Sequence, residues 1–88
     1  MKPRYQPVLV EWLDSTTLSK WGPVEEYQKA ARPSTCVSMG FLLLEDDERL
    51  VILQTIDGDE TGDVMAALAI PRTCVLRIRH LYPKGGKW

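Results

Sequence analysis

The sequence predicts a mostly-β domain, a small barrel of five strands with one short helix between the first and second strands. Short apolar runs recur along the chain and are separated by turn-forming residues, a pattern typical of small β-barrels. The longest apolar stretch, residues 34–56, is interrupted only by the acidic cluster Glu45-Asp46-Asp47-Glu48. Two antiparallel strands joined by a hairpin would account for it. The chain has 88 residues, which is enough for one domain with a thin core.

Residues 8–13 (VLVEWL) are expected to form the first strand, with Val8, Val10 and Trp12 on one face. A helix is expected after Gly22-Pro23, because proline suits the first helical position and two glutamates follow at the positive end of the helix dipole. Pro33 would end it. A helix of about two turns is not stable without packing. We therefore expect it to cover one end of the barrel or to form part of a subunit contact.

The second and third strands are expected at residues 34–44 and 49–56. Gly40 in the middle of the second strand indicates a bulge or a sharp bend, which helps a small barrel to close. The acidic cluster between these strands could bind a metal ion, but the apolar alternation on both sides favours a solvated turn. The loop at residues 57–64 (DGDETGDV) lacks the closing glutamate of a calcium site. No metal site is predicted.

A short fourth strand is expected at residues 66–70, then a tight turn at Pro71-Arg72-Thr73, then a fifth strand at residues 74–81. In the fifth strand, Leu76 and Ile78 are expected to point inward. Residues 84–88 (KGGKW) follow as a flexible basic tail. The prediction is thus one domain, residues 1–83, and a tail.

Cys36 and Cys74 each lie in an apolar run, and their spacing fits no zinc site. We interpret them as two buried thiols in a reducing compartment; a reactive or bridging pair is the alternative. No apolar leader is recognised after Met1, and no stretch reaches the roughly 20 apolar residues of a membrane span. A soluble protein of the cytoplasm is expected. A thin core is often supported by oligomerisation, so a homo-oligomer is expected as well.

Charge is distributed unevenly along the chain. Residues 1–71 carry six Lys or Arg against twelve Asp or Glu, a net charge of −6, whereas residues 72–88 carry five Lys or Arg and no acid, a net charge of +5. Such asymmetry can mark a face that binds an anionic partner. Arg72, Arg77 and Arg79 are the candidate anion-binding residues, since a guanidinium offers a fork of donors that matches phosphate. Trp12, Trp21 or Tyr82 could stack on a base. The alternative is that these arginines pair with the chain's own acids.

Catalytic patterns are absent from the sequence. His80 is the only histidine, and no Ser, Cys or Asp stands near it in the pattern of a catalytic site. No glycine-rich phosphate loop lies between a strand and a helix. We therefore expect no enzymatic activity and no cofactor.

Three segments resemble the SH3-like and Sm-like small barrels: residues 37–43 (VSMGFLL), residues 51–53 (VIL) and residues 70–78 (IPRTCVLRI). In those families a one-turn connection of the Ile-Pro kind links strands four and five. The whole chain also resembles short proteins of bacteriophages and prophages, which have a Trp-x-Asp after the first strand. Sm-like RNA binders carry an Arg-Gly or Lys-Gly pair near the last strand, whereas here the only such pair is Lys84-Gly85 in the tail.

These observations lead to three functional hypotheses. The first is an oligomeric, phage-borne module that binds or sequesters a nucleotide-like or other phosphate-bearing ligand, with a role against host defence. The second is a protein-interaction or assembly factor that uses the barrel edge and the short helix. The third hypothesis is an Sm-like RNA binder. It is weaker than the other two because a negative net charge disfavours binding to long polyanions.

Overall fold

The computed structural model describes residues 4–59 and 62–87. Residues 1–3, part of the acidic loop (Glu60 and Thr61) and the last residue of the predicted tail, Trp88, lie outside the described residues. The elements, in chain order, are β1 (Pro7–Asp14), α1 (Val24–Ala30), β2 (Ser34–Glu45), β3 (Arg49–Ile56), β4 (Val64–Pro71), a 3₁₀ turn (Arg72–Cys74) and β5 (Val75–His80). The predicted mostly-β fold with one short helix between the first two strands is confirmed.

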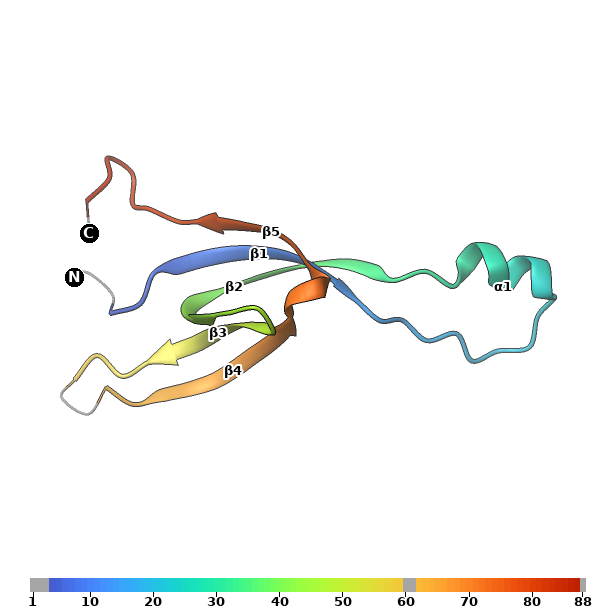
Figure 1. Ribbon diagram of the computed structural model, residues 1–88, viewed down its shortest axis with the longest axis horizontal. Coiled ribbons are helices and arrows are strands. Elements are labelled where there is room, and N and C mark those ends of the chain that lie inside the picture. Colours follow the sequence, from blue (N-terminus) through green and yellow to red (C-terminus); the bar gives the residue numbers. More distant parts are fainter. Residues whose placement is uncertain (1–3, 60–61, 88) are drawn as a thin grey trace.

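The five strands form one antiparallel sheet in the order β4-β3-β2-β1-β5 (Figure 1). Three of its ladders join strands that follow one another in the chain, while β1 pairs with β5 from the far end. In the described part of the chain β4 and β5 are the two edges and no ladder joins them, so the sheet is not closed. The closed barrel therefore stays a prediction.

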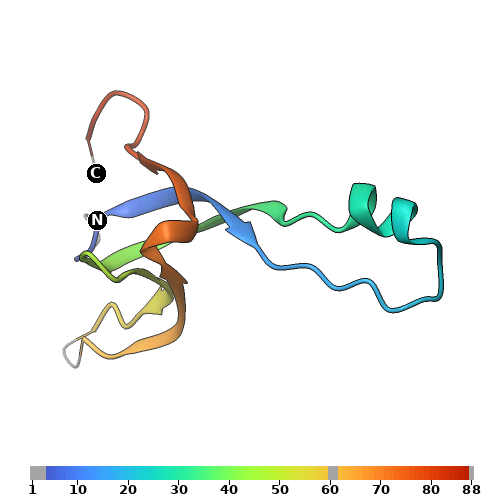
Figure 2. The same ribbon diagram turned by 45° about the vertical axis from the view of Figure 1, so that its right-hand side comes forward.

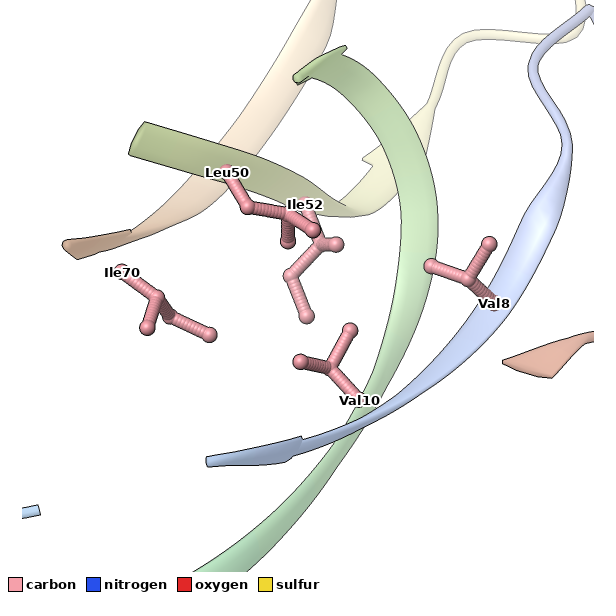
Figure 3. Packing of buried hydrophobic residues seen from close by; sticks show 5 residues of the cluster. All are labelled: Val8, Val10, Leu50, Ile52 and Ile70. Atoms are coloured by element: carbon pink, nitrogen blue, oxygen red, sulfur yellow. The ribbon is translucent and has the colours of Figure 1, made fainter. Parts of the chain in front are cut away.

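The main buried cluster lies on one face of this curved sheet, and the alternating β3 residues Val51 and Leu53 are buried as well. The cluster comes from alternate positions of β1, β3 and β4 and consists of Val8, Val10, Leu50, Ile52 and Ile70 (Figure 3). Trp12 packs against this cluster, so the predicted common face of Val8, Val10 and Trp12 is confirmed, and the structure shows that it is the core face. The edges of the core are closed by partly buried residues of β2, β4, the 3₁₀ turn and β5: Leu42, Leu68, Cys74, Val75 and Ile78.

Gly40 is a point of close approach between β2 and β3. A Cβ atom at this position would lie 2.7 Å from the backbone oxygen of Leu53 and 3.1 Å from the Cβ of Ile52. The bulge expected here occurs later, between Leu42 and Leu44. The β2–β3 ladder extends only over Phe41–Glu45 of β2, so in the described chain residues 34–40 pair with β1 alone. Glycine is therefore needed where the two strands begin to separate.

The fifth strand differs from the prediction at its start. Opposite β1, the register changes from Glu11↔Arg77 to Trp12↔Val75, which leaves Leu76 without a directly opposed residue. Val75 consequently packs against the core and Leu76 is 53% exposed. The prediction that Leu76 points inward is wrong, because a local bulge exchanges the faces of neighbouring residues. The inward orientation of Ile78 is confirmed. The fourth strand is also longer than predicted, starting at Val64.

Residues 15–33 leave the sheet between β1 and β2 and form an arm that carries α1 near its tip (Figures 1 and 2). The helix starts after Pro23 as predicted, and the Pro23 carbonyl accepts from the backbone N–H groups of Glu26 and Tyr27. None of its residues is buried. The expectation that the helix covers one end of the barrel is therefore wrong, because the two legs of the arm continue outward from the β1–β2 pair. The alternative, a subunit contact, stays a prediction.

Candidate functional site

Arg72 is already engaged within the chain. Its Nη1 donates to Oε2 of Glu45 at 3.0 Å, and its backbone N–H donates to the carbonyl of Glu48 at 2.9 Å. Both contacts attach the 3₁₀ turn after β4 to the hairpin between β2 and β3. At Arg72 the structure thus favours the pairing of arginine with an acid of the same chain over a free anion-binding group.

Arg77 and Arg79 lie on one face of β5, and both are exposed. Residues two apart on a strand are about 7 Å apart, so their guanidinium groups could contact one anion together. Their directly opposed residues on β1 are Glu11 and Leu9. No ion pair of Arg77 or Arg79 is found among residues 4–59 and 62–87. This pair is the part of the predicted site that the fold brings together, although Glu11 reduces its positive potential.

Trp21 and Tyr82 do not join the arginines in one chain. Trp21 is fully exposed in the arm just before α1. Tyr82 is 67% exposed and follows β5, in the segment at the opposite end of the molecule from the arm (Figure 1). The predicted combination of arginines with a stacking Trp21 therefore does not form within a single copy of this chain.

The end of the arm exposes a group of apolar side chains, which we call the arm tip: Leu18, Trp21 and Val24. Val24 is 68% exposed and Leu18 39%. They line an open hollow of about 640 Å³, against which Tyr27 is half-buried. The Tyr27 hydroxyl donates a hydrogen bond to the carbonyl of Lys20. This bond connects α1 to the segment that precedes it. The arm tip is thus an exposed apolar surface.

A second apolar surface lies on the sheet face opposite the core. We call it the outer patch: Leu9 of β1 with Val37 and Met39 of β2, which are 60% and 67% exposed. Met39 lies directly opposite Leu9, and Val37 lies opposite Glu11. Since Glu11 is also opposite Arg77, the arginines of β5 border the patch on the same face. The sequence placed Val37 and Met39 on one face of the second strand but left open which face enters the core, and neither residue was recognised as part of a candidate surface.

The sequence already suggested the short helix as a contact element and Trp21 as a site residue, but it did not predict the outer patch, because the search was for charged and stacking groups. The signal for the outer patch was present: residues 34–44 are largely apolar on both faces of one strand and carry no charge. A strand with a solvated face would alternate with polar residues there.

The acidic hairpin forms a turn, as predicted. Oδ1 of Asp46 accepts from the backbone N–H groups of Glu48 and Arg49, both at 2.9 Å. These hydrogen bonds stabilise the carboxylate and lower the pKa of Asp46. In the described part of the chain no three His, Cys, Asp or Glu side chains gather as a metal site requires. Among the same residues no helix is long and apolar enough to cross a bilayer.

Cys36 and Cys74 are free thiols in the structure, so they do not form a bridge. Both are half-buried rather than fully buried as expected. His80 is exposed at the end of β5, opposite Val8.

Comparisons with family models, with curated proteins and with solved structures found no match to this chain.

Proposed function

We propose that this protein is a non-enzymatic protein-interaction module and that the arm tip is its contact surface. The observation that carries the proposal is the fully exposed Trp21 beside a seven-residue helix with no buried residue. A helix this short needs packing to be stable. Tryptophan in a contact is among the residues whose removal costs the most binding energy. A partner that covers the arm tip would provide the packing that the chain itself does not supply.

The chemistry of the arm indicates what the partner surface is like. The apolar arm tip requires an apolar recess of similar size. Glu25 and Glu26, both exposed in the first turn of α1, require positive groups at the rim of that recess. Charged rims act mainly on specificity and association rate, whereas the apolar centre supplies affinity. We infer a protein partner with an apolar surface bordered by Lys or Arg.

A photo-crosslinking residue at Gln28, an exposed position of α1 beside the hollow, tests this proposal in the source cells. We expect a defined cross-linked protein species, and we expect Trp21→Ala to abolish it. The same crosslinker at Thr55, an exposed position of β3, is the control and should not give that species. If Gln28 gives no protein cross-link, or gives one that Trp21→Ala leaves unchanged, the arm tip is not a contact surface.

A second candidate function is the binding of a nucleotide-like or other phosphate-bearing ligand through Arg77 and Arg79. What supports it is that both guanidinium groups are exposed on one strand face without an ion pair in the described chain. Ligand should raise the melting temperature as its concentration rises. Arg77→Ala/Arg79→Ala should remove that shift and leave the fold intact. A shift that survives in the double variant, or no shift with any nucleotide tested, contradicts this function.

The proposal extends to fold type and origin. We propose that the sheet belongs to the SH3-like or Sm-like small barrels; its support is the strand order and the single 3₁₀ turn that connects β4 to β5 directly after Ile70-Pro71. The phage origin, and with it a role in sequestering a host defence signal, is supported only by the resemblance of the sequence to short phage proteins.

A further inference from the structure

We propose that the arm tip of one chain docks on the outer patch of a second copy of this chain, in a two-fold dimer. The inference rests on the proposed function, because it names the partner of the arm. Within the described chain, the outer patch is an apolar sheet surface with Arg77 and Arg79 at its border, which is the chemistry that the arm requires.

Apolar complementarity provides the first line of support. Trp21 and Val24 are exposed at the arm tip, and Val37 and Met39 are exposed on the patch. Methionine adapts its shape to an aromatic ring and makes favourable sulfur–aromatic contacts. In the described chain, residues 34–40 of β2 pair only with β1, so the patch ends at an unpaired edge of β2. Both surfaces would be removed from water in one contact.

Charge complementarity provides the second line of support for the dimer. The arm presents Glu25 and Glu26 in the first turn of its helix, where they are exposed. The patch is bordered by Arg77 and Arg79, whose side chains are exposed on the same sheet face. Docking would place the two acids of one copy against the two arginines of the other. The net charge of the whole chain is only −1, so two copies repel one another little.

The position of the patch at the root of the arm provides the third line of support for the dimer. Val37 lies opposite Glu11, near the end of β1 at Asp14, where the arm begins. The arm carries α1 at its far end (Figures 1 and 2), whereas the register places the patch beside the root of the arm. Two arms side by side and antiparallel would put each tip on the other copy's patch. The same contact is then made twice, and the assembly closes as a dimer.

This arrangement has a consequence for the arginine pair. In one chain Trp21 cannot reach Arg77 and Arg79, because it lies at the end of the arm. In the dimer, Trp21 of one copy would lie beside the arginines of the other. A phosphate-bearing ligand with a base would then find its stacking group and its cationic groups only between two copies.

A charge-exchange experiment tests the dimer. One variant carries Glu25→Arg/Glu26→Arg, and the other carries Arg77→Glu/Arg79→Glu. Each variant alone would bring like charges together at both contacts and should sediment as a monomer. An equimolar mixture restores opposite charges at both contacts, so it should form a heterodimer with the mass of the wild-type dimer. A dimer that forms through any other pair of surfaces would not show this rescue.

Trp21→Ala measures the apolar contribution. Loss of a central aromatic contact typically raises the dissociation constant at least about 30-fold, and the dimer contains this contact twice. Tyr82→Ser, which removes another exposed aromatic side chain outside the arm, is the control and should leave the dissociation constant unchanged. Because Trp21 is fully exposed and lies outside the sheet, the strand signal in the circular dichroism of the variant should match that of wild type.

The oligomeric state of wild type, of each variant and of the mixture is measured by sedimentation over a hundredfold range of protein concentration. Wild-type dimer, monomeric single variants and a restored mixture support the inference. A wild-type monomer, variants that remain dimeric or a mixture that stays monomeric overturn it. The Gln28 cross-link separates this failure from that of the proposed function: a Trp21-dependent cross-link to a different protein retains the interaction module and rejects the dimer, whereas no cross-link rejects both.

Discussion

Gly40→Ala should destabilise the protein although the change adds only one methyl group. The new Cβ would lie 2.7 Å from the backbone oxygen of Leu53, a distance that real Cβ atoms essentially never show. It would also lie 3.3 Å from Cδ1 of Ile52. Leu53 and Ile52 are buried members of β3, so neither can move without displacing that strand.

The magnitude follows from two opposing terms. Replacing glycine by alanine restricts the unfolded chain, which stabilises a protein by about 0.4–1 kcal/mol where the native conformation tolerates the side chain. Overpacking in a well-packed region costs about 1–3 kcal/mol. Since the clash is with backbone, the second term should dominate and leave a net loss of about 1–2 kcal/mol. With a urea m-value of about 1 kcal/mol/M for a small domain, the midpoint should fall by about 1–2 M.

Urea unfolding followed by far-ultraviolet circular dichroism is the assay. Gly58→Ala is the matched control, because a Cβ there would meet no atom within 4 Å. The control midpoint should equal or slightly exceed that of wild type. If the midpoint of Gly40→Ala equals that of Gly58→Ala, the close approach of β2 to β3 does not exist as described.

The remaining predictions concern the core, the hairpin and the 3₁₀ turn. Ile70→Ala should lower the free energy of unfolding by about 2–4 kcal/mol because the side chain is fully buried. Leu76→Ala should change the free energy of unfolding by less than about 0.5 kcal/mol because Leu76 is exposed. If urea melts of the two variants show similar losses of stability, the β5 register is wrong. Asp46→Ala should lower the midpoint at pH 7. The pKa of Asp46 in the folded protein is depressed below its unfolded value of about 3.9. The stability that the Asp46 carboxylate contributes is therefore complete above that pH and is lost as the pH falls through the folded pKa. A mutational loss that is the same at pH 7 and at about pH 2 would contradict this. A double-mutant cycle of Arg72→Ala and Glu45→Ala should give a coupling below about 1 kcal/mol, because both side chains are partly exposed; a larger value would mean that the pair is desolvated.

Much of the fold could be predicted from local pattern. The positions of Val8, Val10 and Trp12 indicate a strand with these three side chains on one face, and this depends only on the two-residue period of extended chain. Four consecutive acids between two apolar runs indicate a turn, since Asp side chains accept hydrogen bonds from nearby backbone. Pro23 indicates the start of the helix.

The candidate site was predicted less well, because its geometry depends on residues far apart in the chain. Arg77 and Arg79 were expected on one outward face of a strand, and they lie there exposed. Trp21 was expected to add a stacking surface to them, but the arm carries it away from β5. Composition could not predict that the arm projects, since the same helix could also have packed back on the sheet.

By itself, the sequence determined which segments are strands, where the helix begins and where the chain turns, because periodicity and turn chemistry act over a few neighbouring residues. Only the tertiary structure decided which of Val75 and Leu76 enters the core, since a bulge against β1 sets that register. It also decided that Arg72 contacts Glu45 across the hairpin and that the arm tip stays uncovered. Each of these depends on contacts between segments distant in the chain, and such contacts leave no local pattern.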